Sequence, residues 1–365
     1  MKGAEILVFA TKGTRSNEEA RILKLLQNFR LQVVPFEQYD KFKSFINIIQ
    51  QALQTKPRLI VMEGTGVLGG IGCLFLRWFY NIPYVFSSGD AIAPFINLNY
   101  PLLVPIARVY EQALCRFCAG FIGWTPYLVG RALTFGAPKG VTAAGWAYFS
   151  RTAEQLADSR VSIRKKLGIS DDSLVFGLLG SIVLTQRFQY CYGYELIKAF
   201  QKTNSKNVTI LVVGDGSGLS YLKQLADQDL GKRIFLPGNV PYEQVLDYMA
   251  AMDVASLPQS VDAVGSFRYT TKLSEYVAAR LPVVTSQIPM AYDIGGDWVW
   301  RLPGAKPWDD SYIDALAVLM ENITDEAINI KKKAIPIQLS DFDQEQQVVR
   351  VTDFISEIIN TDLIS

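Results

Sequence analysis

The chain has 365 residues, of which 49% are hydrophobic and 19% are charged, and it contains no histidine. Without histidine it cannot use a Ser-His-Asp or Cys-His relay, a His-ligated zinc or haem, or an imidazole base. Its 36 Lys and Arg against 35 Asp and Glu give a net charge of +1, which excludes a strong basic field for nucleic acid. Proton transfer must therefore use carboxylates, Lys, Tyr, Cys, water or the substrate.

A chain of this length predicts two domains, each with its own core. We expect an N-terminal acceptor-binding domain at 1–150, a polar linker at 151–172, a donor-binding domain at 173–335, and a C-terminal helix at 336–365 that packs back on the first domain. The apolar run Ile6–Ala10 is too short for a signal peptide, so we expect a cytoplasmic protein. Cys115 and Cys118 form a lone CxxC pair, which indicates buried helix side chains more than a metal or redox site.

In the first half, short apolar runs alternate with longer helical patterns, as in βαβ units. The first helix is signalled by Ser16 and Glu19, a capping-box spacing, before an apolar stripe. The strands predicted here lie near 4–10, 31–36, 58–62, 83–87, 119–124 and 140–143.

The second half repeats this alternation. Its predicted strands lie near 174–180, 207–213, 233–236, 253–257, 282–285 and 298–302. Its predicted helices lie near 192–203, 218–228, 242–251, 270–280 and 309–322, followed by a last amphipathic helix near 342–359. The predicted fold class is α/β, with two Rossmann-like parallel-sheet domains facing a central cleft.

Charge is sparse between Gly64 and Ser150. The charged residues of this segment are Arg77, Asp90, Arg108, Glu111, Arg116, Arg131 and Lys139. Its longest uncharged run contains three prolines, which excludes a regular transmembrane helix. The segment is an apolar core, a membrane-docking surface that combines Trp78, Phe79 and Tyr80 with arginines, or both.

Three glycine-rich turns follow predicted strands. Gly13 and Thr14 form the first, at the start of a helix on the acceptor side, where a ligand can approach backbone N–H groups. The second has Gly64, Gly66 and Gly69 in dinucleotide-binding spacing with Asp90 downstream, but two strands precede it, whereas the fingerprint normally opens the first βαβ unit. The third, VVGDGSG, contains Gly214 and Gly216 and could cradle a phosphate.

The sequence downstream of this third turn resembles the donor domain of retaining GT-B glycosyltransferases of the sucrose-synthase-like family 4. The resemblance rests on FLPGNVPYEQVLDYMAAMDVASLPQS and YTTKLSEYVAARLPVVTS, and on FGLLGS upstream. It implies donor contacts at Gly180, Ser181, Gly214, Gly216, Gly238, Thr270, Thr271 and Glu275. Glu275 would bind the ribose hydroxyls, the helix start at Thr270 and Thr271 would hold the diphosphate, and Lys272 would neutralise the departing phosphate.

The chain departs from the family pattern at several positions. Ser181 stands where the family has an arginine, and the family's Lys-Gly pair has no match in this chain. Arg187 is the nearest cation that could replace the missing arginine or lysine. The alternative is that Arg187 faces solvent. Phe267 stands where the first of the paired glutamates falls, leaving Asp262 or Arg268 to contact the sugar. The acceptor-half histidine is absent, with Asp90 as a polar substitute or a loop-capping carboxylate.

The resemblance predicts a retaining, metal-independent hexosyltransferase that moves a sugar from a nucleotide diphosphate sugar, with UDP favoured, to an acceptor hydroxyl. The leaving phosphate can accept the proton itself, so Lys272, Arg187 and Asp90 are the catalytic candidates and no cofactor is expected. The expected acceptor is a small molecule, a glycan, or a lipid-linked or apolar compound. A lipid-linked or apolar acceptor would also imply that the protein contacts the cytoplasmic face of the membrane peripherally. The alternatives are a non-catalytic nucleotide-binding scaffold and a dinucleotide-dependent oxidoreductase.

Overall fold

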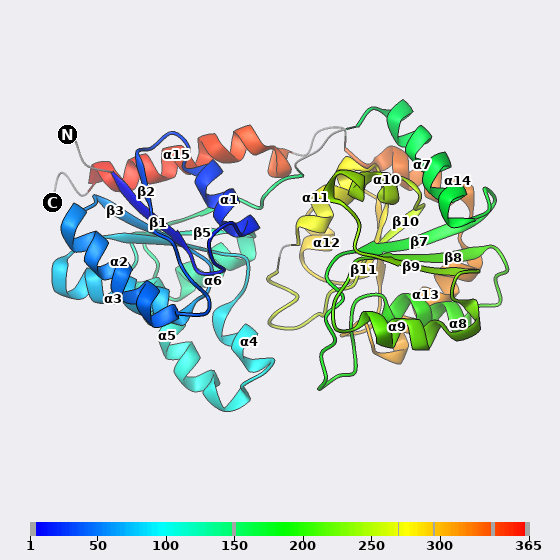
Figure 1. The fold of residues 1–365 in the computed structure, drawn as a ribbon, viewed down its shortest axis with the longest axis horizontal. Coiled ribbons are helices and arrows are strands. Elements are labelled where there is room, and N and C mark those ends of the chain that lie inside the picture. Colours follow the sequence, from blue (N-terminus) through cyan, green and yellow to red (C-terminus); the bar gives the residue numbers. More distant parts are fainter. Residues whose placement is uncertain (1–4, 148–150, 269, 295, 337–339, 362–365) are drawn as a thin grey trace. The chain divides into compact units, whose positions relative to one another are not determined.

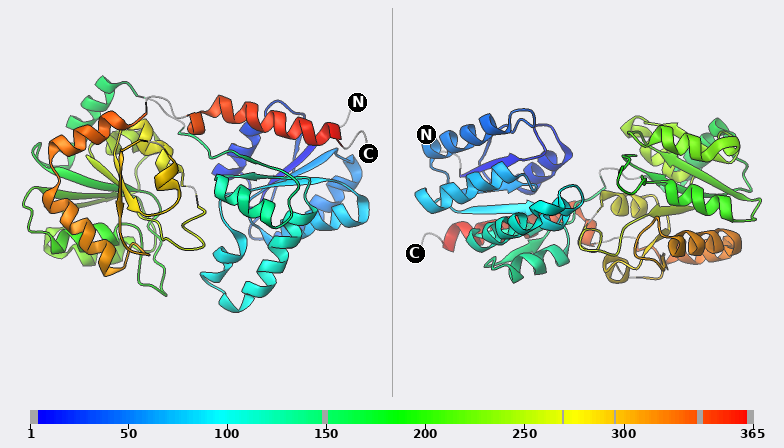
Figure 2. Two further views of the ribbon diagram at one scale, coloured as in Figure 1. Left: turned by 180° about the vertical axis from the view of Figure 1, so that it is seen from behind. Right: turned by 90° about the horizontal axis from the view of Figure 1, so that it is seen from below.

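The computed structural model describes residues 5–147, 151–268, 270–294, 296–336 and 340–361. Its contacts divide the chain into two compact units (Figure 1). Unit 1 comprises Met1–Trp146, Phe267–Tyr269 and Leu339–Ser365, and unit 2 comprises Ala147–Ser266 and Thr270–Gln338. Each unit is built around a six-stranded parallel sheet with helices on both faces, which confirms the predicted pair of Rossmann-like domains (Figure 2).

The sheet of unit 1 has the order β2-β1-β3-β4-β5-β6. Its strands are β1 Ile6–Ala10, β2 Leu31–Val33, β3 Leu59–Glu63, β4 Tyr84–Ser88, β5 Gly120–Gly123 and β6 Gly140–Thr142. Alternate residues of β1 enter different apolar cores, with Leu7 and Phe9 in one and Ile6 and Val8 in the other. A strand buried on both faces reads as a continuous apolar run, which is why β1 was readable from the sequence.

Helices cover both faces of this sheet. They are α1 Asn17–Leu25, α2 Lys41–Thr55, α3 Val67–Tyr80, α4 Ile92–Asn97, α5 Val104–Phe117, α6 Pro126–Thr134 and α15 Gln344–Thr361, with the 3-10 turns η1 Pro101–Leu103 and η4 Ser340–Phe342. The last helix, α15, packs beside α1 and buries Val351 and Ile355 against β1 and β3. The start of α1 is half of the expected capping box: Ser16 accepts the N–H of Glu19, but the Glu19 carboxylate accepts the N–H of Arg15 instead of that of Ser16.

The sheet of unit 2 has the order β12-β11-β10-β7-β8-β9. Its strands are β7 Leu174–Leu179, β8 Val208–Val213, β9 Ile234–Gly238, β10 Val254–Leu257, β11 Val283–Ser286 and β12 Val299–Leu302. Since β7 lies at the centre between β8 and β10, its carboxyl end is flanked by the ends of both neighbours. Ligands of parallel sheets bind at this edge, where the strand order reverses.

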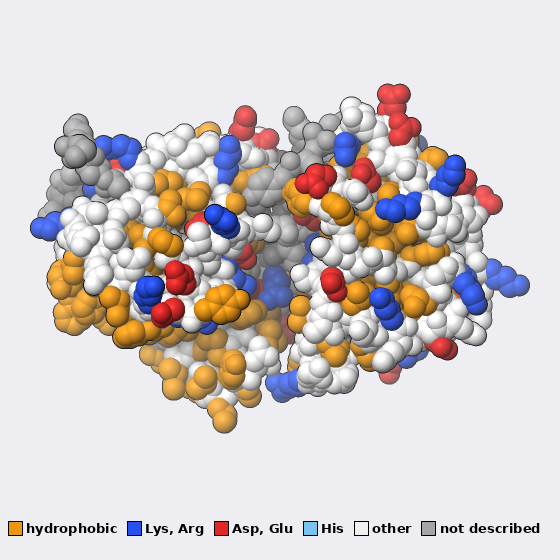
Figure 3. Space-filling view, in the orientation of Figure 1, with side chains coloured by type: hydrophobic (Ala, Val, Ile, Leu, Met, Phe, Trp, Pro, Cys, Tyr) orange, Lys and Arg blue, Asp and Glu red, His pale blue; other side chains and the backbone are white. Residues whose placement is uncertain are grey.

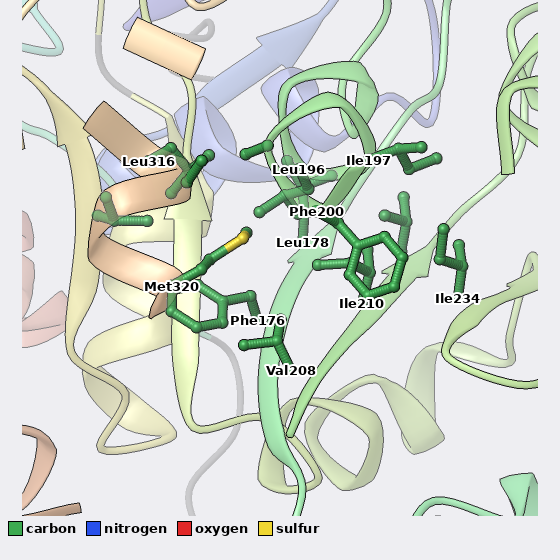
Figure 4. Close-up of a cluster of buried hydrophobic side chains, with 14 of the residues drawn as sticks. Phe176, Leu178, Leu196, Ile197, Phe200, Val208, Ile210, Ile234, Leu316 and Met320 are labelled. Atoms are coloured by element: carbon green, nitrogen blue, oxygen red, sulfur yellow. The ribbon is translucent and has the colours of Figure 1, made fainter. Parts of the chain in front are cut away.

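The helical elements of unit 2 are α7 Ala153–Leu167, α8 Tyr194–Lys202, α9 Leu219–Ala226, α10 Val245–Ala250, α11 Thr271–Ala278, α12 Met290–Asp293, α13 Asp310–Asn322 and α14 Asp325–Ala334, with the 3-10 turns η2 Asp227–Asp229 and η3 Tyr242–Gln244. Helices α8 and α13 lie side by side over one face of the sheet and supply Leu196, Phe200, Leu316 and Met320 to its core (Figure 4).

Residues 151–172, which the polar sequence assigns to a linker, contain the well-formed helix α7, and this helix clusters with unit 2. Its Arg164 is almost fully buried, and the guanidinium lies 2.7 Å from the carboxylate of Asp253 while donating to backbone carbonyls. Asp253 also pairs with Arg160 and accepts the N–H of Val175 at the start of β7. The helix is held by a buried ion-pair network instead of an apolar stripe, so hydrophobic periodicity could not reveal it.

Candidate active site

Three glycine turns meet at the carboxyl edge of the sheet in unit 2. Gly180 follows β7, and its N–H donates to Val213 O at 2.9 Å; Gly214 follows β8, and its N–H donates to Gly238 O at 2.9 Å. Gly214 and Gly216 have φ angles of 144° and 149°, and a β-carbon on either would overlap backbone of the neighbouring turn. The structure thus brings four predicted glycines together, and none of them places a β-carbon between the backbone and a ligand.

Lys272 lies directly on this glycine turn. A β-carbon built on Gly180 would lie 2.7 Å from the Lys272 Nζ, so the lysine fills the space that the glycine leaves. The same ammonium lies 4.8 Å from the ring centre of Tyr192, a cation–π contact. This arrangement holds a positive charge beside the backbone of Gly180 and Gly214, where a diphosphate would need it.

Helix α11 begins beside the lysine. Thr270 is its N-cap residue with extended backbone, and its hydroxyl Oγ1 is buried with no hydrogen-bond partner among the described residues. Thr271 opens the helix, and Glu275 lies one turn further along, half-buried. Burial raises the pKa of the Glu275 carboxyl, while the charge of Lys272 opposes the shift. The helix N-terminus and an unpaired hydroxyl suit an anion, and Glu275 supplies two acceptor oxygens nearby.

The loop between β7 and α8 carries the other two predicted donor residues. Ser181 is exposed at its start. Arg187 is exposed further along, with its guanidinium 5.2 Å from the ring centre of the adjacent Phe188. Arg187 therefore lies on the surface of this loop, stacked on an aromatic ring, and the described contacts do not bring it to Lys272.

The acceptor-side residues Gly13 and Thr14 form the turn after β1. Gly13 has φ of 100°, donates its N–H to Ala10 O at 3.1 Å and is buried, whereas Thr14 is exposed. The turn thus needs glycine for its own backbone conformation, and only its outer residue is open to a ligand.

The dinucleotide-like glycines of unit 1 have a packing role. A β-carbon on Gly64, Gly66 or Gly69 would collide with the side chain of Thr11, which follows β1. The Thr11 hydroxyl donates to Glu63 O at 3.2 Å and accepts the N–H of Gly66 at 3.1 Å. In this chain the spacing of Gly64, Gly66 and Gly69 makes room for the Thr11 side chain at the start of α3.

Asp90, predicted as a polar substitute for the missing histidine, is engaged in an ion pair. Its Oδ1 accepts from Arg268 Nε at 2.7 Å, and residues 267–269 cluster with unit 1. Phe267 packs against the core of unit 1, its carbonyl accepts the hydroxyl of Thr125 at 2.8 Å, and Arg131 lies over its ring. Phe267 therefore anchors this segment at the position where the family pattern has a glutamate.

Sequence reasoning missed a buried polar cluster under the glycine turns. Glu195, in the first turn of α8, is fully buried and accepts hydrogen bonds from Tyr190, Gly193 and Ser256. The hydroxyl of Tyr276, on α11, donates to Ser256 O at 3.1 Å. One signal was available: an acidic residue occupies an apolar-face position of α8, next to Leu196 and Ile197.

The family described as glycosyl transferases group 1 matches residues 159–335. No curated protein matches the sequence. Among solved structures, Alr3699/HepE from Anabaena in complex with UDP superimposes with a TM-score of 0.68 at 16% identity, covering 97% of this chain and 100% of that one. Sucrose-phosphate synthase from Thermosynechococcus elongatus gives 0.69 at 13% identity, covering 98% and 99%.

A third similar structure is a UDP-N-acetylglucosamine 2-epimerase, described as putative, from Listeria monocytogenes, with a TM-score of 0.59 at 11% identity, covering 98% of this chain and 96% of that one. At such identities the likeness shows the shared two-domain GT-B fold alone, and this fold serves transferases and an epimerase alike. The family match and the residues of the site must therefore carry the functional argument.

Proposed function

Since residues 159–335 belong to the glycosyl transferases group 1 family, we propose that this glycosyltransferase moves a sugar from a nucleoside diphosphate sugar to an acceptor hydroxyl with retention of configuration. The observation that carries the proposal is the position of Lys272 on the glycine turn of Gly180, beside the start of α11. The turns and the helix N-terminus supply backbone N–H groups, and the lysine supplies the charge that a diphosphate leaving group requires.

Each group has a defined task in this reaction. Lys272 and the free Thr270 hydroxyl stabilise the negative charge that develops on the departing phosphate. Glu275 accepts hydrogen bonds from the ribose hydroxyls and fixes the nucleoside. The departing phosphate oxygen takes the proton of the acceptor hydroxyl, so the chain needs no imidazole base. UDP is the favoured nucleotide because a structure with the same fold, that of HepE, holds UDP.

We further propose that the reaction needs no metal ion. Within the described residues, no group of three or more Cys, Asp or Glu side chains is placed to hold one. Asp227 and Asp229, the DxD spacing within residues 173–335, lie in the 3-10 turn η2 after α9. Lys272 would then supply the charge stabilisation that a metal provides in other transferases.

Nucleotide binding tests the site directly. Calorimetry with UDP should show binding to the wild type and at least a roughly tenfold loss of affinity for Glu275→Gln, because a charge-assisted hydrogen bond contributes about 1.5–3 kcal/mol. Glu321→Gln, which removes an exposed carboxylate from α13, is the matched control and should bind as the wild type does. Equal affinity for the wild type and Glu275→Gln would contradict the assigned role of Glu275.

One observation favours a second candidate, a nucleotide-binding protein without transfer activity. Phe267 and Arg268 bind within unit 1 where the family pattern places a sugar-binding glutamate, and Arg187 stacks on Phe188. Such a protein would bind UDP but would neither hydrolyse nor transfer the sugar of a UDP-sugar. Slow release of free sugar from UDP-glucose or UDP-galactose by the wild type, absent in Lys272→Gln, would exclude this candidate.

The acceptor in our proposal is lipid-linked or apolar and lies at a membrane surface. Exposed apolar side chains gather on α3, η1 and α5 of unit 1, and Figure 3 shows apolar surface over this part of the unit. Leu102 is 92% exposed and Ile106 69%, and an open hollow of about 420 Å³ lies against α5. No helix in the described ranges is long and apolar enough to cross a bilayer, so the contact we propose is peripheral.

The charge of this surface fits an anionic bilayer. Arg108 and Arg116 are exposed on α5, whereas the acid of the same helix, Glu111, is buried and paired with Arg131 at 2.8 Å. The exposed face of α5 therefore combines apolar side chains with positive charge, which is the composition of a surface that binds anionic lipid.

Flotation with phosphatidylglycerol vesicles tests this part of the proposal. The wild type should float at low salt, and a Leu102→Ser, Ile106→Ser double variant should remain at the bottom. Val318→Ser, which removes an exposed apolar side chain from α13 of unit 2, is the control and should float. A wild type that stays at the bottom with these vesicles would contradict membrane docking without affecting the nucleotide site.

A further inference from the structure

Glu195 is a buried acid without a counter-charge. Its Oε2 accepts hydrogen bonds from the Tyr190 hydroxyl at 3.1 Å and the Gly193 N–H at 3.2 Å, and its Oε1 accepts from the Ser256 hydroxyl at 3.3 Å. No Lys or Arg of the described ranges forms an ion pair with it. Burying a carboxyl group costs free energy, whereas burying an apolar side chain at the same position would not. This cost indicates that Glu195 has a role beyond filling space in the core.

The partners of Glu195 lead to the nucleotide site. The ring of Tyr190 meets that of Tyr192 edge-on, with centres 6.3 Å apart, and the Tyr192 ring supports the ammonium of Lys272 at 4.8 Å. The hydroxyl of Tyr192 accepts a hydrogen bond from Gln259 at 3.4 Å. Since Tyr190, Tyr192 and Gly193 all belong to the loop between β7 and α8, Glu195 fixes the end of the loop that contacts Lys272.

We propose that Glu195 is a positioning residue of the nucleotide site, which holds the loop between β7 and α8 so that Tyr192 keeps Lys272 over Gly180. This inference rests on the proposed function, because it takes Lys272 as a phosphate-binding group. Glu195 itself touches neither substrate nor Gly180, so it acts through Tyr190 and Tyr192.

The protonation of Glu195 makes this support sensitive to pH. Burial raises the pKa of Glu195 to about 7, and the hydrogen bonds from Tyr190, Gly193 and Ser256 oppose the shift. The other titratable groups that face it are Tyr190, Cys191, Tyr276 and Tyr312, and burial raises the pKa of each, so all four stay neutral near pH 7. Glu195 is therefore the member of this cluster that changes charge near neutrality.

The direction of the effect follows from the cost of a buried charge. Because burial outweighs the hydrogen bonds, ionisation of Glu195 destabilises the folded surroundings that hold Tyr190 and Tyr192, so the hold on Lys272 weakens and nucleotide affinity should fall as pH rises through about 7. In calorimetry, UDP-glucose should bind the wild type roughly threefold or more tightly at pH 6 than at pH 8. UDP-glucose is the probe because its diphosphate is a diester and does not titrate in this range.

The variant Glu195→Gln keeps the shape of the side chain and carries no charge, so its affinity should be the same at both pH values. Glu321→Gln should follow the wild type. Binding with the same pH dependence in the wild type and Glu195→Gln overturns the role of Glu195 alone. No binding of UDP-glucose by any variant overturns the proposed function, and with it the role of Glu195 at a nucleotide site.

A second measurement needs no nucleotide. The ring of Trp308 lies 4.6 Å from that of Tyr190, so its fluorescence reports on this end of the loop. The wild-type emission should change with a midpoint near pH 7, and Trp308→Phe should remove the change. Tyr190→Phe deletes a hydrogen bond that favours the ionised form, so it should move the midpoint to higher pH. An unmoved midpoint in Tyr190→Phe would overturn the proposed link, even if Glu195→Gln failed to fold.

Discussion

The buried carboxyl of Glu195 should make the stability of unit 2 depend on pH, and replacing it with glutamine should remove that dependence. Burial raises its pKa from the ordinary 4.5 to about 7 in the folded protein. Between these values the folded chain keeps a proton that the unfolded chain has lost. The stabilisation that this proton gives is fully present below pH 4.5 and is lost as the pH rises through about 7.

The size of the effect follows from the same numbers. A difference of 2.5 pKa units, 7 minus 4.5, corresponds to about 3 kcal/mol of free energy of unfolding. Because Glu195 is fully buried, solvent screening does not reduce this figure. Relative to Glu195→Gln, the wild type should therefore lose about 3 kcal/mol between pH 4.5 and pH 8.

Urea unfolding of both proteins at several pH values measures this loss. Taking the difference between wild type and variant at each pH cancels the titration of every other group, and the part of the tryptophan emission that Trp308→Phe removes follows unit 2. A difference that stays constant from pH 4.5 to pH 8 would refute the reasoning, because Glu195 would then titrate alike in the folded and unfolded chains.

Three further substitutions test the frameworks of the two units. Gly214→Ala should strongly destabilise unit 2, because the added carbon overlaps the carbonyl of Gly180. Gly130→Ala in α6, where nothing lies within 4 Å of the added carbon, should stabilise unit 1 by about 0.5–1 kcal/mol. The melting temperatures of both variants check these expectations. Asp253→Asn should cost roughly 3–5 kcal/mol, because Arg164 is left buried without its counter-charge, and urea unfolding monitored at Trp308 should show the loss.

Most strands were readable from the sequence because they are buried apolar runs, whereas β2 (LQV) and β6 (GVT) are short and only partly buried. Local polar structure was not readable in the same way. Helix α7 is held by Arg164 and Asp253, whose pairing links positions far apart in the chain. The 3-10 turn η3 and the short helix α10 occupy the predicted helix 242–251, since the chain tightens there into a three-residue turn before the helix proper.

The candidate site divides in a similar manner. The glycines of the site could be predicted because turns that bring two backbone segments close together after strands require glycine. Lys272 could be predicted because the family resemblance implied it. Asp90 and Phe267 could not be assigned, since their roles depend on a segment of 267–269 that clusters with residues more than a hundred positions away. Glu195 was missed because helical periodicity can place a residue on the buried face of a helix but cannot identify the hydroxyl groups from other segments that donate hydrogen bonds to it.

The absence of histidine does not leave this chain without a group that titrates near neutrality. A carboxyl reaches a pKa of about 7 when burial removes its hydration and no cation compensates it, and Glu195 meets both conditions. Burial also raises the pKa of Glu63, but there Arg21 at 2.8 Å opposes the shift with a charge that Glu195 lacks. A change of nucleotide affinity near pH 7 that Glu195→Gln removes would thus be assigned to Glu195, because Glu275, whose pKa burial also raises, is unaltered in that variant.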